Sequence, residues 1–130
     1  MSETWKVVVQ KLREKFPVSN ISSGTLVALP VGRHVRDEVF LNDCVRRGYN
    51  TDTTLEDVEK TLHLFFRGHE VPLVPNMRAN YFFVRDIEGR LRPVAVFVDK
   101  KREACDIRVY REKSKGGLSL GAHVMVLKGE

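Results

Sequence analysis

Residues 80–98 read NYFFVRDIEGRLRPVAVFV, and this stretch decides the class of fold. Two runs rich in β-branched and aromatic residues, 80–85 and 93–98, flank the polar stretch 86–90. Such runs predict strands, and Gly89 can adopt the left-handed conformation that a tight loop needs. The stretch therefore predicts an antiparallel β-hairpin in the second half of the chain.

Three further strands are expected from short apolar runs that lie between turn residues. The first run is halted by Pro30 and Gly32, and the last follows the Gly-rich loop 113–121. The pattern predicts these strands over residues 25–29, 105–110 and 122–127. Together with the hairpin they make a mainly antiparallel sheet.

Helices are predicted where apolar residues recur every three or four positions. The first such segment closes before Pro17, and the other two end in an arginine followed by Gly48 and by Gly68, which suits a helix C-terminus. Thr53 or Thr54 can cap the third helix. We expect the helices over residues 4–16, 36–47 and 54–67. The chain is thus predicted to be one α+β domain, residues 1–130, with these helices packed on the sheet.

The composition is that of an ordinary folded protein. Apolar residues make up 42% of the chain and charged residues 30%, far from the profile of a disordered protein. No apolar run is long enough to span a membrane, and the N-terminus lacks the apolar stretch of a signal peptide. We interpret Cys44 and Cys105 as reduced core thiols, with a disulfide between them as the alternative. A cytoplasmic location is therefore expected.

Positive charge is concentrated in the second half of the chain. Lys and Arg number 22 against 17 Asp and Glu, for a net charge of +5. Residues 1–75 hold equal numbers of both kinds, so the whole excess falls within residues 76–130. A basic surface attracts phosphate-rich partners over long range, although a solvated basic face is the alternative interpretation. The cations expected to contact nucleic acid are Arg85, Arg90, Arg92, Lys100, Lys101, Arg102, Lys113 and Lys115.

Three short motifs match enzyme or nucleotide-binding signatures, and each lacks the context that the chemistry needs. Residues 117–121 match G-x-S-x-G, but a predicted strand follows where a nucleophile elbow needs a helix. The basic loop 113–117 lacks the G-x-x-x-x-G-K order of a phosphate-binding loop. His69-Glu70 begins like H-E-x-x-H, but Leu73 stands at the second histidine. No cofactor and no metal are therefore expected.

Residues 80–84 and 94–101 resemble the hairpin of PD-(D/E)xK nucleases. In that family an acid at the head of the first strand and an acid-x-Lys at the end of the second bind metal and activate water. The resemblance implies this role for Asp99 and Lys101, whereas Asn80 stands where the first carboxylate should be. A neutral amide leaves the metal ions short of charge, so we expect no nuclease activity.

The order of the predicted elements also resembles a winged-helix domain over residues 4–98. The resemblance implies that helix 54–67 enters the major groove and that the hairpin tip touches the phosphate backbone. The three arginines around the tip suit that role, but Glu56 and Glu59 on the exposed side of the helix would repel phosphate. Base reading by this helix is therefore not expected.

The leading hypothesis is a small basic, non-enzymatic module that contacts nucleic acid within a larger complex. The rival is a protein-interaction or regulatory subunit, or a homo-oligomer, that meets its partner through helix 54–67 or an exposed strand edge. Pro93 inside a predicted strand indicates such an edge, or a bulge. A degenerate nuclease hairpin is the third hypothesis.

Overall fold

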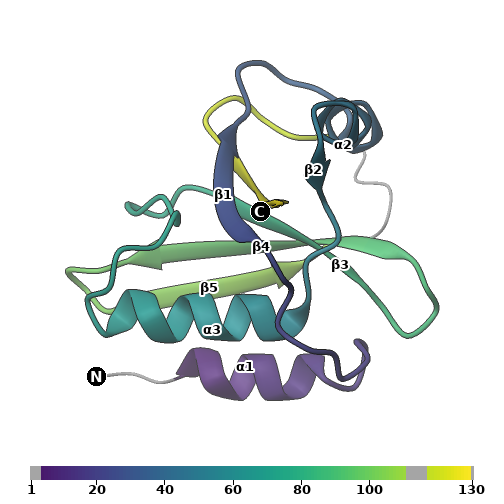
Figure 1. The fold of residues 1–130 in the computed structure, drawn as a ribbon. Coiled ribbons are helices and arrows are strands. Elements are labelled where there is room, and N and C mark those ends of the chain that lie inside the picture. The colour runs from purple at the N-terminus through teal and green to yellow at the C-terminus, as the bar shows by residue number, and fades with distance from the viewer. Residues whose placement is uncertain (1–3, 111–116, 130) are drawn as a thin grey trace.

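Six strands form one sheet in the computed structural model, which describes residues 4–110 and 117–129 (Figure 1). The strands follow the order β1-β6-β3-β4-β5, and the short β2 also pairs with β6. Their bounds are Thr25–Pro30 for β1, Tyr49–Asn50 for β2, Asn80–Arg85 for β3, Leu91–Asp99 for β4, Ala104–Val109 for β5 and His123–Lys128 for β6. Only the β3–β6 pair is parallel among these strands. The predicted α+β class with a mainly antiparallel sheet is confirmed.

The β3–β4 hairpin forms as predicted, and its tip is held by one buried carboxylate. Asp86 accepts hydrogen bonds from the backbone N–H groups of Glu88 and Arg90 at 2.9 and 3.0 Å. Gly89 has a φ of +81°, in the region that side chains with a Cβ rarely adopt. The turn residues of the sequence therefore form the expected tight loop.

Two helices cover the first face of the sheet. α1 (Thr4–Leu12) and α3 (Leu55–Phe66) lie side by side across it (Figure 1). Thr54 caps α3, because its hydroxyl accepts the N–H of Asp57 while the Asp57 carboxylate accepts the N–H of Thr54. Burying apolar side chains of this layer stabilises the fold. The central strands contribute Phe82, Val84, Val94, Val96, Val98 and Met125 to it, all fully or almost fully buried.

The second face is covered only in part. α2 (Asp37–Arg46) and the loop before β6 pack here against β1 and β6, with Phe83 of β3 at the edge of this smaller core. Both other helices of the described residues belong to the first face. Tyr81 of β3 and Leu91 of β4 pack against the same core, so α2 covers part of the second face of β3, whereas no described residue of β5 belongs to this core.

The first helix is shorter than the predicted 4–16. α1 ends at Leu12, and the following residues continue with tighter hydrogen bonds such as that from the Lys15 N–H to the Leu12 carbonyl at 2.9 Å. Phe16 nevertheless enters the core with only 1% of its surface exposed. Its burial explains why the apolar period extends beyond the helix. The other predicted elements begin and end within one or two residues of their observed bounds.

Residues Tyr49–Asn50 form a short strand that the sequence pattern did not predict. β6 pairs with β3 through residues 123–125 and with β2 through residues 127 and 128, so it changes partner along its length. Thr53 then forms a parallel bridge with Val84 of β3. A strand of two residues is too short to give a periodic signal, which is why the sequence did not reveal it.

Pro93 does not mark an edge strand, because β4 lies between β3 and β5. The Pro93 carbonyl accepts the N–H of Tyr110 at 2.9 Å, just past the last residue of β5. The nitrogen and oxygen of one strand residue point to the same side, so the missing N–H also faces the end of β5. The sheet tolerates proline here because β5 has already ended.

The two cysteines lie on opposite faces of the sheet. Cys44 belongs to the core of the second face, Cys105 packs against the core of the first, and both are free thiols. The alternative of a disulfide between them is therefore wrong. No helix within residues 4–110 and 117–129 is long and apolar enough to cross a membrane.

Candidate functional site

The cations predicted to contact nucleic acid fall at opposite ends of β4. Arg85, Arg90 and Arg92 lie at the β3–β4 hairpin, whereas Lys100, Lys101 and Arg102 form the β4–β5 turn. β4 has 9 residues, and a strand of that length separates its ends by about 30 Å. Lys113 and Lys115 lie outside the described residues. The structure thus does not bring the six described cations together on one surface.

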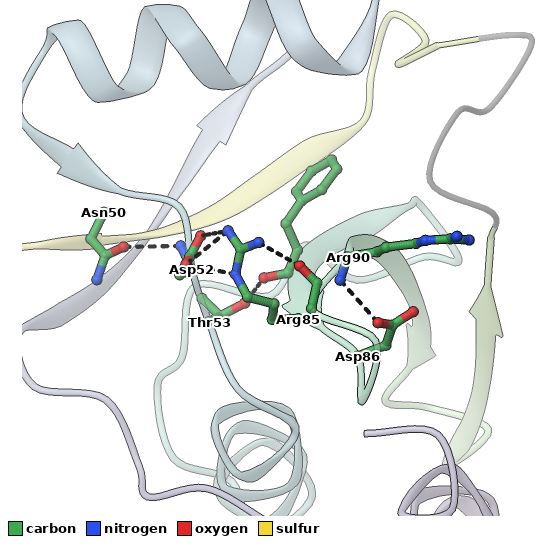
Figure 2. A network of polar contacts seen from close by, with 8 residues as sticks. Asn50, Asp52, Thr53, Arg85, Asp86 and Arg90 are labelled. Carbon is green, nitrogen blue, oxygen red and sulfur yellow. Dashed lines mark hydrogen bonds and ion pairs between the residues drawn. The ribbon is translucent and has the colours of Figure 1, made fainter. Parts of the chain in front are cut away.

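Two of the hairpin arginines are engaged in holding the chain together. Both Nε and Nη2 of Arg85 lie 3.2 Å from Oδ2 of Asp52, and Nη1 donates to the Gly89 carbonyl at 2.8 Å. Figure 2 shows how these contacts tie the segment after β2 to the hairpin. Arg92 donates to the Tyr110 carbonyl at 3.2 Å, and its side chain is only 21% exposed. A ligand would have to compete with these contacts.

Arg90, Lys100, Lys101 and Arg102, the other predicted cations that the structure describes, are exposed. The guanidinium of Arg90 lies 3.6 Å from the Glu88 carboxylate. In the β4–β5 turn, Lys100 and Arg102 contact neighbouring side chains, whereas Lys101 has no ion-pair partner among the residues described. Lys100 likewise lacks an ion-pair partner there, so both lysines of the turn carry a charge that no described acid offsets.

Three aromatic side chains gather on the second face of the sheet, next to the core that α2 covers. Tyr81 and Phe97 lie on β3 and β4, and Tyr110 directly follows β5. Phe82 follows Tyr81, and Val96 and Val98 flank Phe97; these three side chains point into the first core, so the two rings point to the second face. All three rings are half-buried, and the centroids of Tyr81 and Tyr110 are 6.4 Å apart.

A hollow of about 540 Å³ lies beside these rings. Tyr81 and Phe97 line it together with Arg78 and the loop at residues 119–122. Arg78 is exposed, and its guanidinium has no hydrogen bond or ion pair with any described residue. Leu120 of the same loop is 72% exposed. The hollow thus combines aromatic walls with a cation whose donors are available.

A second cation lies over one of the rings. The guanidinium carbon of Arg108 is 5.1 Å from the centroid of the Phe97 ring, and its Nε is 2.9 Å from the Asp106 carboxylate. The hydrogen bond with Asp106 raises the pKa of Arg108, which stays charged. Asp106 offsets part of the positive charge on this surface. We call the surface formed by Arg78, Tyr81, Phe97, Arg108 and Tyr110 the aromatic face.

The environment keeps the Tyr81 hydroxyl protonated. Burial, the neighbouring Tyr110 and the charge of Asp37 raise the pKa of Tyr81. Asp37 begins α2, and both of its carboxylate oxygens are buried without a hydrogen-bond partner among the described residues. Burial also raises the pKa of Asp37. The aromatic face therefore presents a neutral phenol next to a carboxylate that is costly to ionise.

The sequence did not single out the aromatic face, because runs such as 80–85 and 93–98 are apolar on both sides of the strand. A signal was present in β5 and the residue after it, where Cys105, Ile107 and Val109 alternate with Asp106, Arg108 and Tyr110. Such alternation indicates a strand with one exposed face. It would have pointed to Arg108 and Tyr110, but not to their partners on β3 and β4.

The amide that replaces the first nuclease carboxylate is a structural group. Asn80 is fully buried, and its Oδ1 accepts the N–H of Val74 at 2.8 Å. Its Nδ2 faces the carbonyls of Val74, Arg78 and Val96 at 3.0, 3.2 and 3.1 Å. The described residues contain no group of three or more His, Cys, Asp or Glu side chains placed to hold a metal ion. Asn80 thus fixes the chain before β3 to the sheet.

No protein-family model, no curated protein and no solved structure matches the chain. The function is therefore inferred from the chemistry of the aromatic face and from the fold that carries it.

Proposed function

We propose that the protein is a non-enzymatic module that contacts single-stranded nucleic acid through the aromatic face. One observation carries the proposal: Tyr81, Phe97 and Tyr110 lie half-buried together on one face of the sheet, beside the core that α2 covers. Proteins that bind single strands combine such rings, on which bases stack, with cations that follow the phosphate backbone. Both kinds of group occur together on this surface.

The hollow next to Tyr81 and Phe97 supports stacking by at least one base. Its volume of about 540 Å³ is in the range of sites that hold small organic groups. Tyr81 and Tyr110 are tilted by 47° relative to each other, so a flat base can stack on one of these rings but not on both at once. Stacking contributes roughly 1–3 kcal/mol per base.

Phosphate contacts are assigned to Arg78, Arg108 and Lys101. The guanidinium of Arg78 has no partner among the described residues, and that of Arg108 is held over Phe97 with its side chain 61% exposed. Arginine can bind phosphate through two N–H groups at once. Lys101 lies in the turn that follows β4, the strand that carries Phe97. It can extend the track of positive charge beyond the rings.

A single strand fits this surface better than a duplex. Bases stack on protein rings only when they are not already stacked within a double helix. α2 packs on the second face of the sheet and α3 on the first, so the two helices of the winged-helix resemblance do not support the binding of a duplex. In addition, Arg13 binds Glu56 and Glu59 on α3, the helix that would have read the bases.

A protein-interaction or regulatory subunit is the second candidate function. Tyrosine and arginine are also enriched at protein interfaces, and Leu120 exposes 72% of its surface next to the hollow. A partner protein could therefore occupy the same face. We retain a cytoplasmic location and assembly within a larger complex as parts of the proposal, the former because both thiols are free.

Fluorescence anisotropy with a labelled uridine-rich strand, a thymidine-rich strand and a duplex tests the proposal at low and moderate salt. We expect salt-sensitive binding that favours the single strands. Tyr81→Ala should weaken binding by roughly 5-fold to 100-fold, the loss of about one stacked base. Arg78→Glu should weaken it by about tenfold or more, because it reverses a charge beside the bound strand.

Arg67→Glu is the matched control, because Arg67 is exposed at the end of α3, on the other side of the sheet. Circular dichroism confirms that each variant is folded. The proposal is rejected if the wild-type protein binds no single strand at low salt. It is also rejected if Arg78→Glu and Arg67→Glu lose the same amount of affinity for the single strand. Recovery of a protein partner that Tyr81→Ala abolishes, without strand binding, would establish the second candidate instead.

A further inference from the structure

A separate groove lies alongside α2, and none of its lining residues belongs to the aromatic face. Its volume is about 570 Å³, and it runs between the connection at residues 30–35 and one side of α2. Val31, Val35 and Phe40 form its apolar floor, and all three pack into the core of the second face. Val39 stands at the groove with 48% of its surface exposed, although it is aliphatic. The groove therefore offers an apolar surface that no described side chain fills.

Three arginines surround this apolar floor. Arg33 is exposed and has no ion pair or hydrogen bond with any described residue. Arg46 is 79% exposed and lies 3.5 Å from Asp43, which is the one acid of the lining. The guanidinium carbon of Arg47 is 5.5 Å from the centroid of the Tyr49 ring. The three arginines and one carboxylate leave the groove with a clear excess of positive charge.

The contact between Arg47 and Tyr49 prepares Arg47 to bind an anion. A guanidinium that lies over a ring is held in place, while the N–H groups at its edge remain available to a carboxylate. Less side-chain freedom is then lost on binding than for an arginine that moves freely in water. Arg33 lies in the connection at residues 30–35, whereas Arg47 directly follows the last residue of α2 on the other side of the groove.

We propose that this groove binds a short acidic segment of a partner protein. An aliphatic side chain of the segment lies on Val39 and the floor, and its carboxylates contact Arg33 and Arg47. Charge complementarity selects the acidic partner, and the exposed aliphatic floor selects one with an apolar anchor. A nucleic acid is less suited to this site, because no exposed ring is present among the lining residues for a base to stack on.

Isothermal titration calorimetry with a synthetic peptide that alternates glutamate and leucine tests the proposal on the full chain. We expect saturable binding that weakens with salt, and no binding of matched peptides in which glutamine replaces glutamate or serine replaces leucine. Arg33→Glu and Arg47→Glu should each weaken binding by about 3-fold to 10-fold or more, because each turns an attraction into a repulsion. Val39→Asp should weaken it through loss of the apolar contact.

Arg67→Glu serves again as the control, since it changes the net charge equally but lies at the end of α3. Unchanged affinity in Arg67→Glu beside reduced affinity in the groove variants supports the proposal. Equal losses in all arginine variants would show only nonspecific attraction and would overturn it. Failure of the peptide to bind the wild-type protein would also overturn the proposal. The same holds if Val39→Asp weakens the binding of a single-stranded oligonucleotide but leaves the binding of the peptide unchanged.

Discussion

The guanidinium of Arg108 lies over the ring of Phe97, 5.1 Å from the ring centroid, across the boundary between β5 and β4. Phe97 stands directly opposite Asp106, so the contact with Arg108 is a diagonal one between neighbouring strands. The cation–π contact keeps the charged group at the aromatic face while its edge stays open to solvent. One pair of residues thus joins the two kinds of contact that a single strand requires, an aromatic surface and a positive charge.

Asn80→Asp is expected to destabilise the protein rather than to restore a metal site. A carboxylate at this buried position would face the same three carbonyl oxygens that now surround the amide nitrogen of Asn80. Burying an unpaired charge there should lower the free energy of unfolding by about 3 kcal/mol or more. Urea denaturation followed by circular dichroism measures the change.

Asn42→Asp is the control for that substitution, because Asn42 is exposed on α2. Its effect should stay within about 0.5 kcal/mol. A stable Asn80→Asp protein that cleaves a strand with magnesium or manganese, and loses cleavage on Asp99→Ala, would contradict our interpretation of Asn80 and revive the nuclease hypothesis.

Asp37→Asn is expected to stabilise the protein near neutral pH. Burial raises the pKa of Asp37 above the ordinary value of 3.8, so folding favours its protonated form. The stability that protonated Asp37 contributes to the folded protein is fully present below the pKa of Asp37 in the unfolded chain. This stability is lost as the pH rises through the raised pKa of Asp37 in the folded protein. Asparagine does not ionise, so the gain in melting temperature over wild type should be largest near neutral pH and shrink as the medium is acidified.

Glu38→Gln separates the effect of burial from the effect of the helix dipole. Glu38 lies in the same first turn of α2, and its side chain is 67% exposed. Removing its charge should slightly destabilise the helix, since acids near a helix N-terminus are favourable. Thermal unfolding in buffers of different pH gives the melting temperature as a function of pH for Asp37→Asn and for Glu38→Gln. A pH-independent difference between wild type and Asp37→Asn would show that the Asp37 carboxylate is not buried as described.

Both cysteines are expected to react slowly with alkylating agents in the folded protein. Burial raises the pKa of Cys105 to about 12 and also raises the pKa of Cys44. The thiolate is the form that reacts. Because the pKa of each thiol is raised, only a small fraction of either cysteine is deprotonated at mildly alkaline pH. Mass spectrometry after iodoacetamide treatment should show slow labelling in buffer and two labelled thiols in urea. Rapid labelling of Cys105 in the folded protein, or a Cys44–Cys105 cross-link, would contradict the structure.

Strong local patterns allowed much of the fold to be predicted. The apolar runs on both sides of residues 86–90 were sufficient for the hairpin, and the choice of Thr53 or Thr54 as cap placed the start of α3 to within one residue, where Thr54 is the cap observed. The parallel pairing of β3 with β6 was not predictable in this way, because it joins residues about forty positions apart with no local signal. The two-residue β2 was not predicted either, because so short a strand has no local periodic signal.

The candidate site was predicted less well, because charge in the sequence does not show which charges are already paired. Arg85 looked available but binds Asp52, whereas Arg78 was not selected and has no partner among the described residues. Tyr81 and Phe97 belong to runs that are apolar throughout, so only the tertiary structure shows how much of their side of the sheet α2 covers. Which face of a strand is covered depends on distant segments of the chain.

Amide chemical-shift mapping by nuclear magnetic resonance, with a uridine-rich single strand added to the labelled protein, tests the central claim most directly. We predict that the largest shifts fall on the aromatic face, at Arg78, Tyr81, Phe97, Arg108 and Tyr110, and that they diminish as salt is raised. Shifts confined to the hairpin tip at residues 86–90 or to the groove beside α2, or no shifts at low salt, would contradict the claim.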